Sequence, residues 1–235
     1  MKKLLAEIVY PHHCSLCKKE GLILCPDCQK TIPIKKIPSC PICQDKRSSF
    51  EICPRCKNAV HFSLDGIFVT AFWEDPLLKK LIYNFKYDFV LDVKFILERI
   101  INDFVKYHQI CRYLKSPSDV VVCPVPLHPD RLLWRGFNQS SLLAENLAIS
   151  LGASYQEDLL TRTRATAPQM LLDDVNDRKL NVYEAFTANN ASDVRGKTVI
   201  ILDDVTTTGA TLNECAKALK KFKPQNIYGF VLAQG

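Results

Sequence analysis

The chain has 235 residues, of which 47% are hydrophobic and 24% are charged, and its formal net charge is +6. This composition is ordinary for a globular protein with one substantial core and a small additional region. Charged residues interrupt every apolar run long before the roughly 20 residues that a membrane helix needs, and Glu7 cuts the N-terminal apolar run too early for a signal peptide. We therefore expect a cytoplasmic protein without a membrane span.

Eight of the eleven cysteines form four Cys-x-x-Cys pairs between residues 14 and 56. This spacing is typical of structural zinc sites, in which four thiolates fill the tetrahedral coordination shell. The region contains several prolines and shows no helical or strand period, so a metal is needed to hold it together. The alternative, a redox Cys-x-x-Cys, normally occurs as one pair in a thioredoxin-like unit.

The predicted ligands are Cys14, Cys17, Cys25 and Cys28 for one zinc ion and Cys40, Cys43, Cys53 and Cys56 for another. Sequential pairing is the simplest arrangement because the gap inside each quartet is short, but a cross-braced arrangement and a single occupied site stay open. The other cysteines stand alone in apolar or helical surroundings and are predicted to be small, buried hydrophobes. They are Cys111, Cys123 and Cys215.

The positive charge gathers in residues 1–60, which hold 11 Lys and Arg against 5 Asp and Glu. A basic segment can indicate nucleic-acid binding. However, one Zn²⁺ with four thiolates carries a charge of −2, so two such sites would lower the charge of this segment from +6 to +2. Electrostatics alone therefore gives no argument for DNA.

We predict a Cys-rich zinc-binding domain at residues 1–62 and a larger domain at 63–235, because the composition changes near residue 61. In order, the elements predicted in the larger domain are a strand at 66–73, helices from 76 and from 90 to 107, a strand at 119–123, a helix from 138 capped by Asn138, a long loop at 161–180, a strand at 199–202, a helix at 211–221 and a strand at 227–232. This β-α-β succession predicts an α/β fold with a parallel sheet and a ligand at the carboxyl ends of its strands.

One segment, Val199 to Leu212, carries most of the functional argument. Four apolar residues are followed by Asp203 and Asp204, a hydroxyl-rich turn with Gly209, and the next helix. Such a turn offers backbone N–H groups and hydroxyls to a phosphate, and the helix N-terminus adds a favourable dipole. Carboxylates beside it suit ribose hydroxyls, which donate hydrogen bonds. A ribose 5-phosphate fits both features, and the alternative is that the acids merely cap the helix.

This segment closely resembles the signature with which type I phosphoribosyltransferases bind phosphoribosyl pyrophosphate (PRPP). The resemblance implies a type I phosphoribosyltransferase-like parallel sheet flanked by helices, and Mg²⁺ that bridges pyrophosphate and ribose. It assigns the 2′ and 3′ hydroxyls to Asp203 and Asp204, as the catalytic residues. It assigns the 5′-phosphate to the loop formed by Thr207, Thr208, Gly209, Ala210 and Thr211. Thr206 departs from the signature, because that position is more often aliphatic.

Over nearly the whole chain, the sequence is similar to the ComF/GntX family, whose members join a cysteine-rich N-terminus to a phosphoribosyltransferase-like domain. Besides the cysteine pairs, this resemblance is carried by Phe85-Lys86-Tyr87, Pro124-Val125-Pro126-Leu127-His128, Arg135-Gly136-Phe137-Asn138-Gln139, Arg164 with Pro168-Gln169, and Arg178 with Asn181. It implies an association with DNA uptake in natural transformation.

Several arginines are candidates for contact with a polyanionic ligand. The family places its pyrophosphate loop at residues 124–128, and Arg131 and Arg135 lie just downstream, where their forked guanidinium groups could meet phosphate. The alternative is a solvated helix face. Arg162, Arg164 and Arg178 lie in the predicted long loop and could close over the substrate as a lid, or remain idle.

Two hypotheses follow. The first is a Mg²⁺-dependent phosphoribosyltransferase that transfers phosphoribosyl from PRPP, or a related phosphoribosyl ligand, to an unknown acceptor. The second is a non-catalytic accessory protein that binds single-stranded DNA, works with the DNA-uptake machinery and uses the pocket as a ligand or nucleotide sensor. Aromatic and basic residues interleave at residues 83–87, as base stacking requires, but helical spacing directs Leu81, Ile82 and Phe85 into the core.

Overall fold

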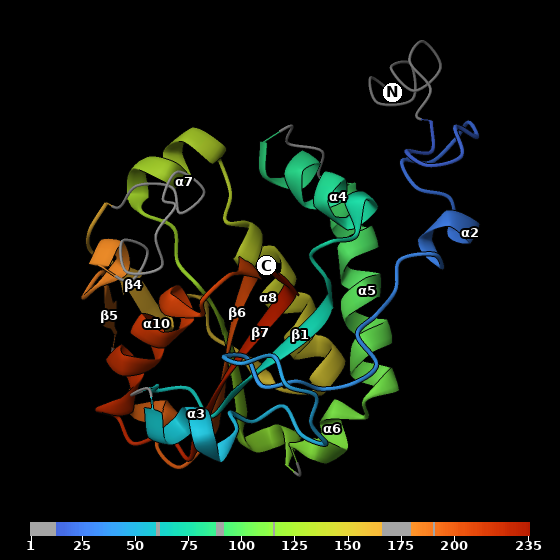
Figure 1. Ribbon diagram of the computed structural model, residues 1–235. Helices are drawn as coiled ribbons and strands as arrows, with labels where there is room; N and C mark the ends of the chain where they lie inside the picture. The colour runs from blue at the N-terminus through green and yellow to red at the C-terminus, as the bar shows by residue number, and fades with distance from the viewer. Residues whose placement is uncertain (1–12, 60–61, 88–91, 115, 166–179, 190) are drawn as a thin grey trace.

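The computed structural model describes residues 13–59, 62–87, 92–114, 116–165, 180–189 and 191–235 (Figure 1). Its centre is a parallel sheet of five strands in the order β1-β7-β6-β2-β3. The strands are β1 (Gly66–Phe72), β2 (Val120–Pro124), β3 (Ser154–Tyr155), β6 (Thr198–Thr206) and β7 (Asn226–Gln234). The predicted parallel α/β sheet is confirmed.

Helices cover both faces of this sheet. One face packs against α4 (Pro76–Tyr87), α5 (Val93–Tyr107) and α8 (Gln139–Leu151). The other packs against α10 (Ala210–Lys220) and an antiparallel pair formed by β4 (Leu160–Arg162) and β5 (Phe186–Ala188). Figure 1 shows α4 and α5 on one side of the sheet and α10 with β4 and β5 on the other. Because both faces are covered, the central strands are apolar throughout rather than alternating.

The helices begin and end where the side chains favour it. The predicted cap at Asn138 is confirmed, since its Oδ1 accepts a hydrogen bond from the Ser140 amide at 3.1 Å. Leu81, Ile82 and Phe85 are buried in the core, as predicted. The shorter helices are α2 (Pro26–Gln29), α3 (Pro54–Ala59), α6 (Ile110–Tyr113) and α7 (Pro129–Arg135), and single 3₁₀ turns lie at Pro117–Asp119, Glu157–Leu159 and Ala191–Val194.

The long loop predicted at residues 161–180 is wrong at its beginning. Arg162 lies in β4, pairs with Phe186 and is buried, because this strand packs its apolar neighbours Leu159 and Leu160 under the sheet. A strand of three residues is too short to show a period in the sequence. Arg178 and the Pro168-Gln169 pair lie outside the described residues.

The N-terminal region packs against the larger domain at several points. Cys14, Leu24 and Ile32 belong to the same buried cluster as α5. The chain at residues 34–36 runs along the outer edge of β1, where the Lys35 amide donates to the Thr70 carbonyl at 2.8 Å, and so protects an edge strand. The domain boundary after residue 62 stays a prediction. Within the described ranges, no helix is both long and apolar enough to cross a membrane.

Candidate functional site

The two acids lie at the carboxyl end of β6, next to the end of β2, where the topology predicts a ligand. Successive side chains of a strand point to opposite faces, so the two carboxylates have different neighbours. Asp204 is only 3% exposed and faces α4 and α8, while Asp203 is partly exposed. The acid pair is therefore not a pair of equivalent ligands.

Asp204 is held by three donors. The Lys86 ammonium lies 2.9 Å from its Oδ1, the Gln139 side-chain amide donates to its Oδ2 at 3.1 Å, and the Val205 amide donates to its Oδ1 at 2.6 Å. Burial lowers the pKa of Lys86, but the charges of Asp204 and Asp203 outweigh that effect and raise it overall. The result is a buried, hydrogen-bonded ion pair that joins α4 to the end of β6.

This network extends to α7. Gln139 accepts a hydrogen bond from Arg135 Nη1 at 2.6 Å, and the guanidinium of Arg135 lies 5.5 Å from the centre of the Tyr87 ring. Arg135 is 9% exposed, so it belongs to this interior network, and its contact with phosphate stays a prediction. The interaction of Lys86 with Asp204 was not predicted from the sequence. The signal was present, because three of the segments that carry the family resemblance meet here: residues 85–87, 135–139 and 203–204.

Asp203 has a different environment. Its Oδ1 accepts hydrogen bonds from the Ser140 hydroxyl at 3.2 Å and from the Asp204 amide at 2.9 Å. Burial and the neighbouring charge of Asp204 raise the pKa of Asp203 to about 7, against the lowering effect of Lys86. A ligand that stabilises the charged form of such a carboxyl group lowers its pKa, so the group becomes ionised at neutral pH when the ligand binds.

The turn after β6 folds around its own hydroxyls. Thr206 Oγ1 accepts a hydrogen bond from the Gly209 amide at 3.0 Å, and Thr208 Oγ1 accepts one from the Ala210 amide at 3.3 Å. Gly209 has φ +75°, a conformation that favours glycine. Thr206, the departure from the signature, thus closes the turn. Thr207 Oγ1 is buried and has no hydrogen-bond partner among the residues that the structure describes.

The charge of Arg162 interacts with that of Asp203, and Arg131 and Arg135 continue this group of positive charges. Burial and the charge of Arg135 lower the pKa of Arg131. Burial and the charge of Arg131 lower the pKa of Arg162, partly offset by Asp203. Such mutual repulsion between guanidinium groups makes the site attractive to a polyanion. Arg164 instead donates to the carbonyls of residues 180, 181 and 183 at 2.6 to 3.4 Å, and so ties the chain before β5.

A cavity of about 500 Å³ is connected with this site through Arg162, although residues 203–211 do not line it. It lies between the loop after β2, helices α7 and α8, and the β3–β4 segment, and Arg162 and Asn138 contribute to its walls. Its volume would accommodate a small organic molecule next to Arg162.

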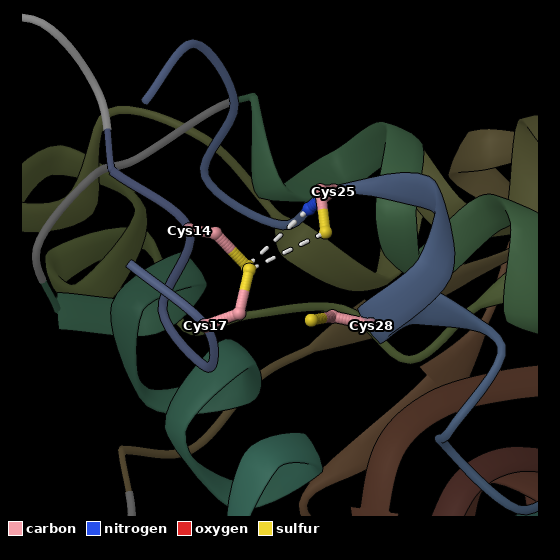
Figure 2. A group of neighbouring side chains, drawn as sticks. All are labelled: Cys14, Cys17, Cys25 and Cys28. Atoms are coloured by element: carbon pink, nitrogen blue, oxygen red, sulfur yellow. Dashed lines mark hydrogen bonds between the residues drawn. The ribbon is translucent and has the colours of Figure 1, made fainter. Parts of the chain in front are cut away.

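The eight paired cysteines form two separate groups, each with all its sulfur atoms within 4.8 Å of one another. Figure 2 shows the side chains of Cys14, Cys17, Cys25 and Cys28 converging from a turn and from the start of α2. The other group contains Cys40, Cys43, Cys53 and Cys56. This grouping is sequential, so the cross-braced alternative is wrong.

The geometry of both groups fits zinc. The Cys17 and Cys25 sulfurs are 3.7 Å apart and the Cys43 and Cys53 sulfurs 3.8 Å apart, while tetrahedral zinc with bonds of about 2.3 Å requires about 3.8 Å. The Cys25 amide approaches the Cys14 sulfur at 3.5 Å, an N–H···S contact that stabilises a thiolate.

The thiol pKa values fit a metal as well. Burial alone would raise the pKa of Cys14, but backbone donors, that of Cys25 foremost, lower it to about 6. A side-chain hydrogen bond with Cys25, which favours the protonated Cys28 thiol, and burial raise the pKa of Cys28 to about 12. Four crowded thiols cannot all ionise together, whereas a divalent cation would replace their protons. Both groups could therefore bind zinc.

The two groups repeat the same backbone. Each begins with an isolated antiparallel bridge, His13 with Glu20 and Ser39 with Lys46. Each has a left-handed residue directly after its second cysteine, Lys18 with φ +63° and Gln44 with φ +59°. Neither is glycine, so this repeat is not visible in the residue types.

Comparisons with known proteins agree with this geometry. A model of the phosphoribosyl transferase domain matches residues 136–234. Competence protein F of Haemophilus influenzae is 29% identical over 224 residues, which cover 89% of this chain and 96% of that protein. DNA utilization protein YhgH of Escherichia coli K12 is 32% identical over 209 residues, covering 83% and 90%. The chain belongs to the ComF/GntX family.

A further member of the ComF/GntX family, competence protein ComFC of Streptococcus pneumoniae, is 25% identical over 222 residues and covers 93% of this chain and 91% of that protein. Among solved structures, the glutamine PRPP amidotransferase from B. subtilis in complex with ADP and GMP matches 59% of this chain and 26% of that chain at 18% identity, with a TM-score of 0.36. Adenine phosphoribosyltransferase from Leishmania donovani covers 58% and 64% at 16% identity, with a TM-score of 0.30. Scores this low add nothing to the fold, which rests on the sheet topology and the domain match.

Proposed function

We propose that this protein binds PRPP with Mg²⁺ at residues 203–211 and acts in DNA uptake or DNA utilisation. The observation that carries the ligand assignment is the buried hydroxyl of Thr207 in the turn between Asp203 and helix α10, which finds no partner in the part of the chain that the structure describes. A buried hydroxyl without a partner costs free energy that a bound phosphate would recover. The names of the related competence and DNA utilization proteins support the pathway.

The two acids take different roles in this proposal. Asp203 accepts hydrogen bonds from the ribose hydroxyls, because its carboxyl group is partly exposed and already poised to ionise. Asp204 acts as a positioning residue, since Lys86 and Gln139 already occupy its two oxygens. The 5′-phosphate lies in the turn at Thr207 to Thr211, against the N-terminus of α10.

The residues present also fit Mg²⁺ and pyrophosphate. Mg²⁺ prefers carboxylate and phosphate oxygens and keeps several waters, so one carboxylate with the ligand's own phosphates suffices. Bound Mg²⁺ would neutralise negative charge on the pyrophosphate leaving group. Arg162 contributes positive charge that acts on Asp203, and Arg131 in turn acts on Arg162.

We further propose that each cysteine group binds one structural zinc ion. Four thiolates leave no coordination position for water or substrate, so these sites hold the fold rather than take part in chemistry. The reducing cytoplasm, which keeps such thiols free of disulfides, is the proposed compartment.

Calorimetric titration with PRPP and Mg²⁺ tests the ligand assignment. The parent protein should bind, and Asp203→Asn should lose at least about tenfold in affinity, because a carboxamide is a weaker acceptor than a carboxylate. Glu157→Gln, which changes an exposed acid outside residues 203–211, is the matched control and should bind like the parent. A folded parent that binds no PRPP would refute the assignment.

Transfer requires a separate assay. Pyrophosphate release in the presence of candidate acceptors would demonstrate phosphoribosyl transfer. The cavity of about 500 Å³ that Arg162 lines has room for an acceptor. Binding of PRPP without release in any acceptor screen favours a sensor instead.

Single-stranded DNA binding is the second candidate function. The observation that favours it is the aromatic pair on α4: Tyr83 is 53% exposed, and its ring centre lies 4.9 Å from that of Tyr87. Exposed aromatic faces stack on unpaired bases, at about 1–3 kcal/mol per base. Fluorescence anisotropy with a labelled oligo(dT) should show Tyr83→Ala weakening binding at least about fivefold; equal binding by both proteins would exclude this surface.

A further inference from the structure

The second cysteine group, Cys40 to Cys56, is linked to the candidate phosphate loop through Gln234 and Phe62. We propose that the zinc ion of this group positions the loop at residues 206–211 through Gln234, so that the two metal sites are functionally unequal. This inference rests on the PRPP site proposed above and adds a positioning residue and a metal dependence to it.

Gln234 is the central link. It ends β7 and pairs in register with Thr206, the last residue of β6. Its side-chain amide nitrogen donates to the Pro41 carbonyl at 2.7 Å and to the Thr207 carbonyl at 3.4 Å. The next amide, that of Gly235, donates to the Thr206 carbonyl at 2.9 Å. One side chain thus joins the candidate phosphate loop to the second cysteine group.

Pro41 lies within the Cys40-x-x-Cys43 turn of that group. Its preceding residue, Cys40, accepts a backbone hydrogen bond from Gln44 at 2.9 Å and donates one to Asp45 at 2.9 Å. Because the proposed ligands Cys40 and Cys43 flank it, the position of the Pro41 carbonyl follows from metal coordination.

A second contact lies on the other side of the loop. Phe62 packs against the second cysteine group and also against the cluster beneath α10. A Cβ atom added to Gly209 would lie 2.9 Å from the Phe62 ring, so the ring and the loop backbone approach closely. The next amide, that of Ser63, donates to the side-chain oxygen of Asn213 in the first turn of α10 at 2.6 Å.

The second cysteine group has too little apolar material to hold these contacts without its metal. Its buried cluster contains three cysteines and one isoleucine, with Ile42, Cys43 and Phe62 packed against it. Regions of this size depend on a staple for their structure. Loss of this metal would therefore release both Pro41 and Phe62 from the loop.

The first cysteine group packs elsewhere and supplies a matched comparison. Its Gln29 side chain donates to the Ile96 carbonyl of α5 at 3.4 Å and accepts from Arg99 at 3.1 Å. Figure 1 shows α2 beside α5, away from α10. Gln29 and Gln234 thus make the same kind of contact, one on each cysteine group.

The test compares Gln234→Ala with Gln29→Ala, after zinc content and thermal unfolding show that both proteins are folded and metal-loaded. Hydrogen–deuterium exchange of the unliganded proteins measures the protection of the loop amides, and titration with PRPP and Mg²⁺ measures the affinity of the site. We expect Gln234→Ala to accelerate amide exchange at residues 207–211 about 3- to 10-fold and to weaken PRPP binding by a similar factor, as for loss of one hydrogen bond. Gln29→Ala should change neither quantity.

Two further comparisons of variants separate the effect of side-chain packing from that of the metal. Gln234→Glu keeps the size of the side chain but cannot donate to either carbonyl, so it should behave like Gln234→Ala. Replacing Cys43 and Cys53 by Ser should accelerate loop exchange more than replacing Cys17 and Cys25. Exchange rates equal to the parent's in both Gln234 variants would overturn the inference. If the loop loosens as expected but the parent binds no PRPP, the positioning role stands and the ligand assignment fails.

Discussion

Replacement of Lys86 by methionine should strongly destabilise the protein. The side chains of Lys86 and Asp204 are 18% and 5% exposed, and their charged atoms are 2.9 Å apart. Methionine fills most of the same volume but removes the ammonium group. Asp204 then keeps its hydrogen bonds from Gln139 and Val205 but loses the one ion pair that it makes among the described residues.

The expected loss is about 3 kcal/mol in the free energy of unfolding. Removing one partner of a buried ion pair costs about 3–5 kcal/mol, and the remaining donors to Asp204 place this case at the lower end. The folded-state pKa of Lys86 is raised above its ordinary value of 10.5, so the contribution of the pair is fully present below pH 10.5 and is lost as the pH rises through the folded pKa. The measurement belongs at pH 7 to 8.

Urea unfolding of four proteins provides the assay: the parent, Lys86→Met, Asp204→Asn and the double variant. The double variant should be at least about 1 kcal/mol more stable than Lys86→Met, because it no longer buries an unpaired charge. If Lys86→Met unfolds within about 0.5 kcal/mol of the parent, or if the two substitutions are additive, the ion pair does not join α4 to β6 in the way that the distances indicate.

Three other predictions concern the ligand and the metals. PRPP affinity should rise about tenfold from pH 6 to pH 8 as Asp203, with a pKa of about 7, ionises, and calorimetry should find that Asp203→Asn removes this dependence. Thr207→Val removes a hydroxyl that has no partner among the described residues, so urea unfolding should find the unliganded protein within about 1 kcal/mol of the parent. The same substitution should weaken PRPP binding about tenfold. An equal affinity would contradict the phosphate role of that hydroxyl. Metal analysis should find two zinc ions per chain, one for each cysteine group, and a chelator should release both and lower the melting temperature; one ion per chain would show that a single site is occupied.

The sheet and the acid-bearing turn could be predicted from the sequence because their signals are local. Val199 to Leu202 is apolar on both faces, which only a covered parallel strand requires, and Gly209 marks the left-handed turn before the helix. The sequential pairing of the cysteines was predictable for the same reason, since each quartet closes a short stretch of chain.

The difference between the two acids could not be predicted in this way. It depends on α4 and α8, which bring Lys86 and Gln139 to the same face of β6 from distant parts of the chain. Helical spacing predicts that Leu81, Ile82 and Phe85 are buried, but it gives no partner for Lys86. Likewise, a strand of three residues is too short to show a period, so the sequence does not predict that Arg162 is buried against the Phe186 ring.

The buried hydrogen-bond network around Asp204 gives the two adjacent acids different electrostatic roles. Lys86 and Gln139 fix Asp204 as a neighbour that ligand cannot easily displace, and its charge, together with burial, is what raises the pKa of Asp203 to about 7. Two free carboxylates at this place would both repel the phosphates of the proposed ligand. The charge of Asp204 is neutralised by Lys86, and Asp203 is close to its pKa at neutral pH, so the unliganded site carries little net negative charge. The proposed ligand brings hydroxyl donors and a cation, and these interactions would favour the ionised form of Asp203.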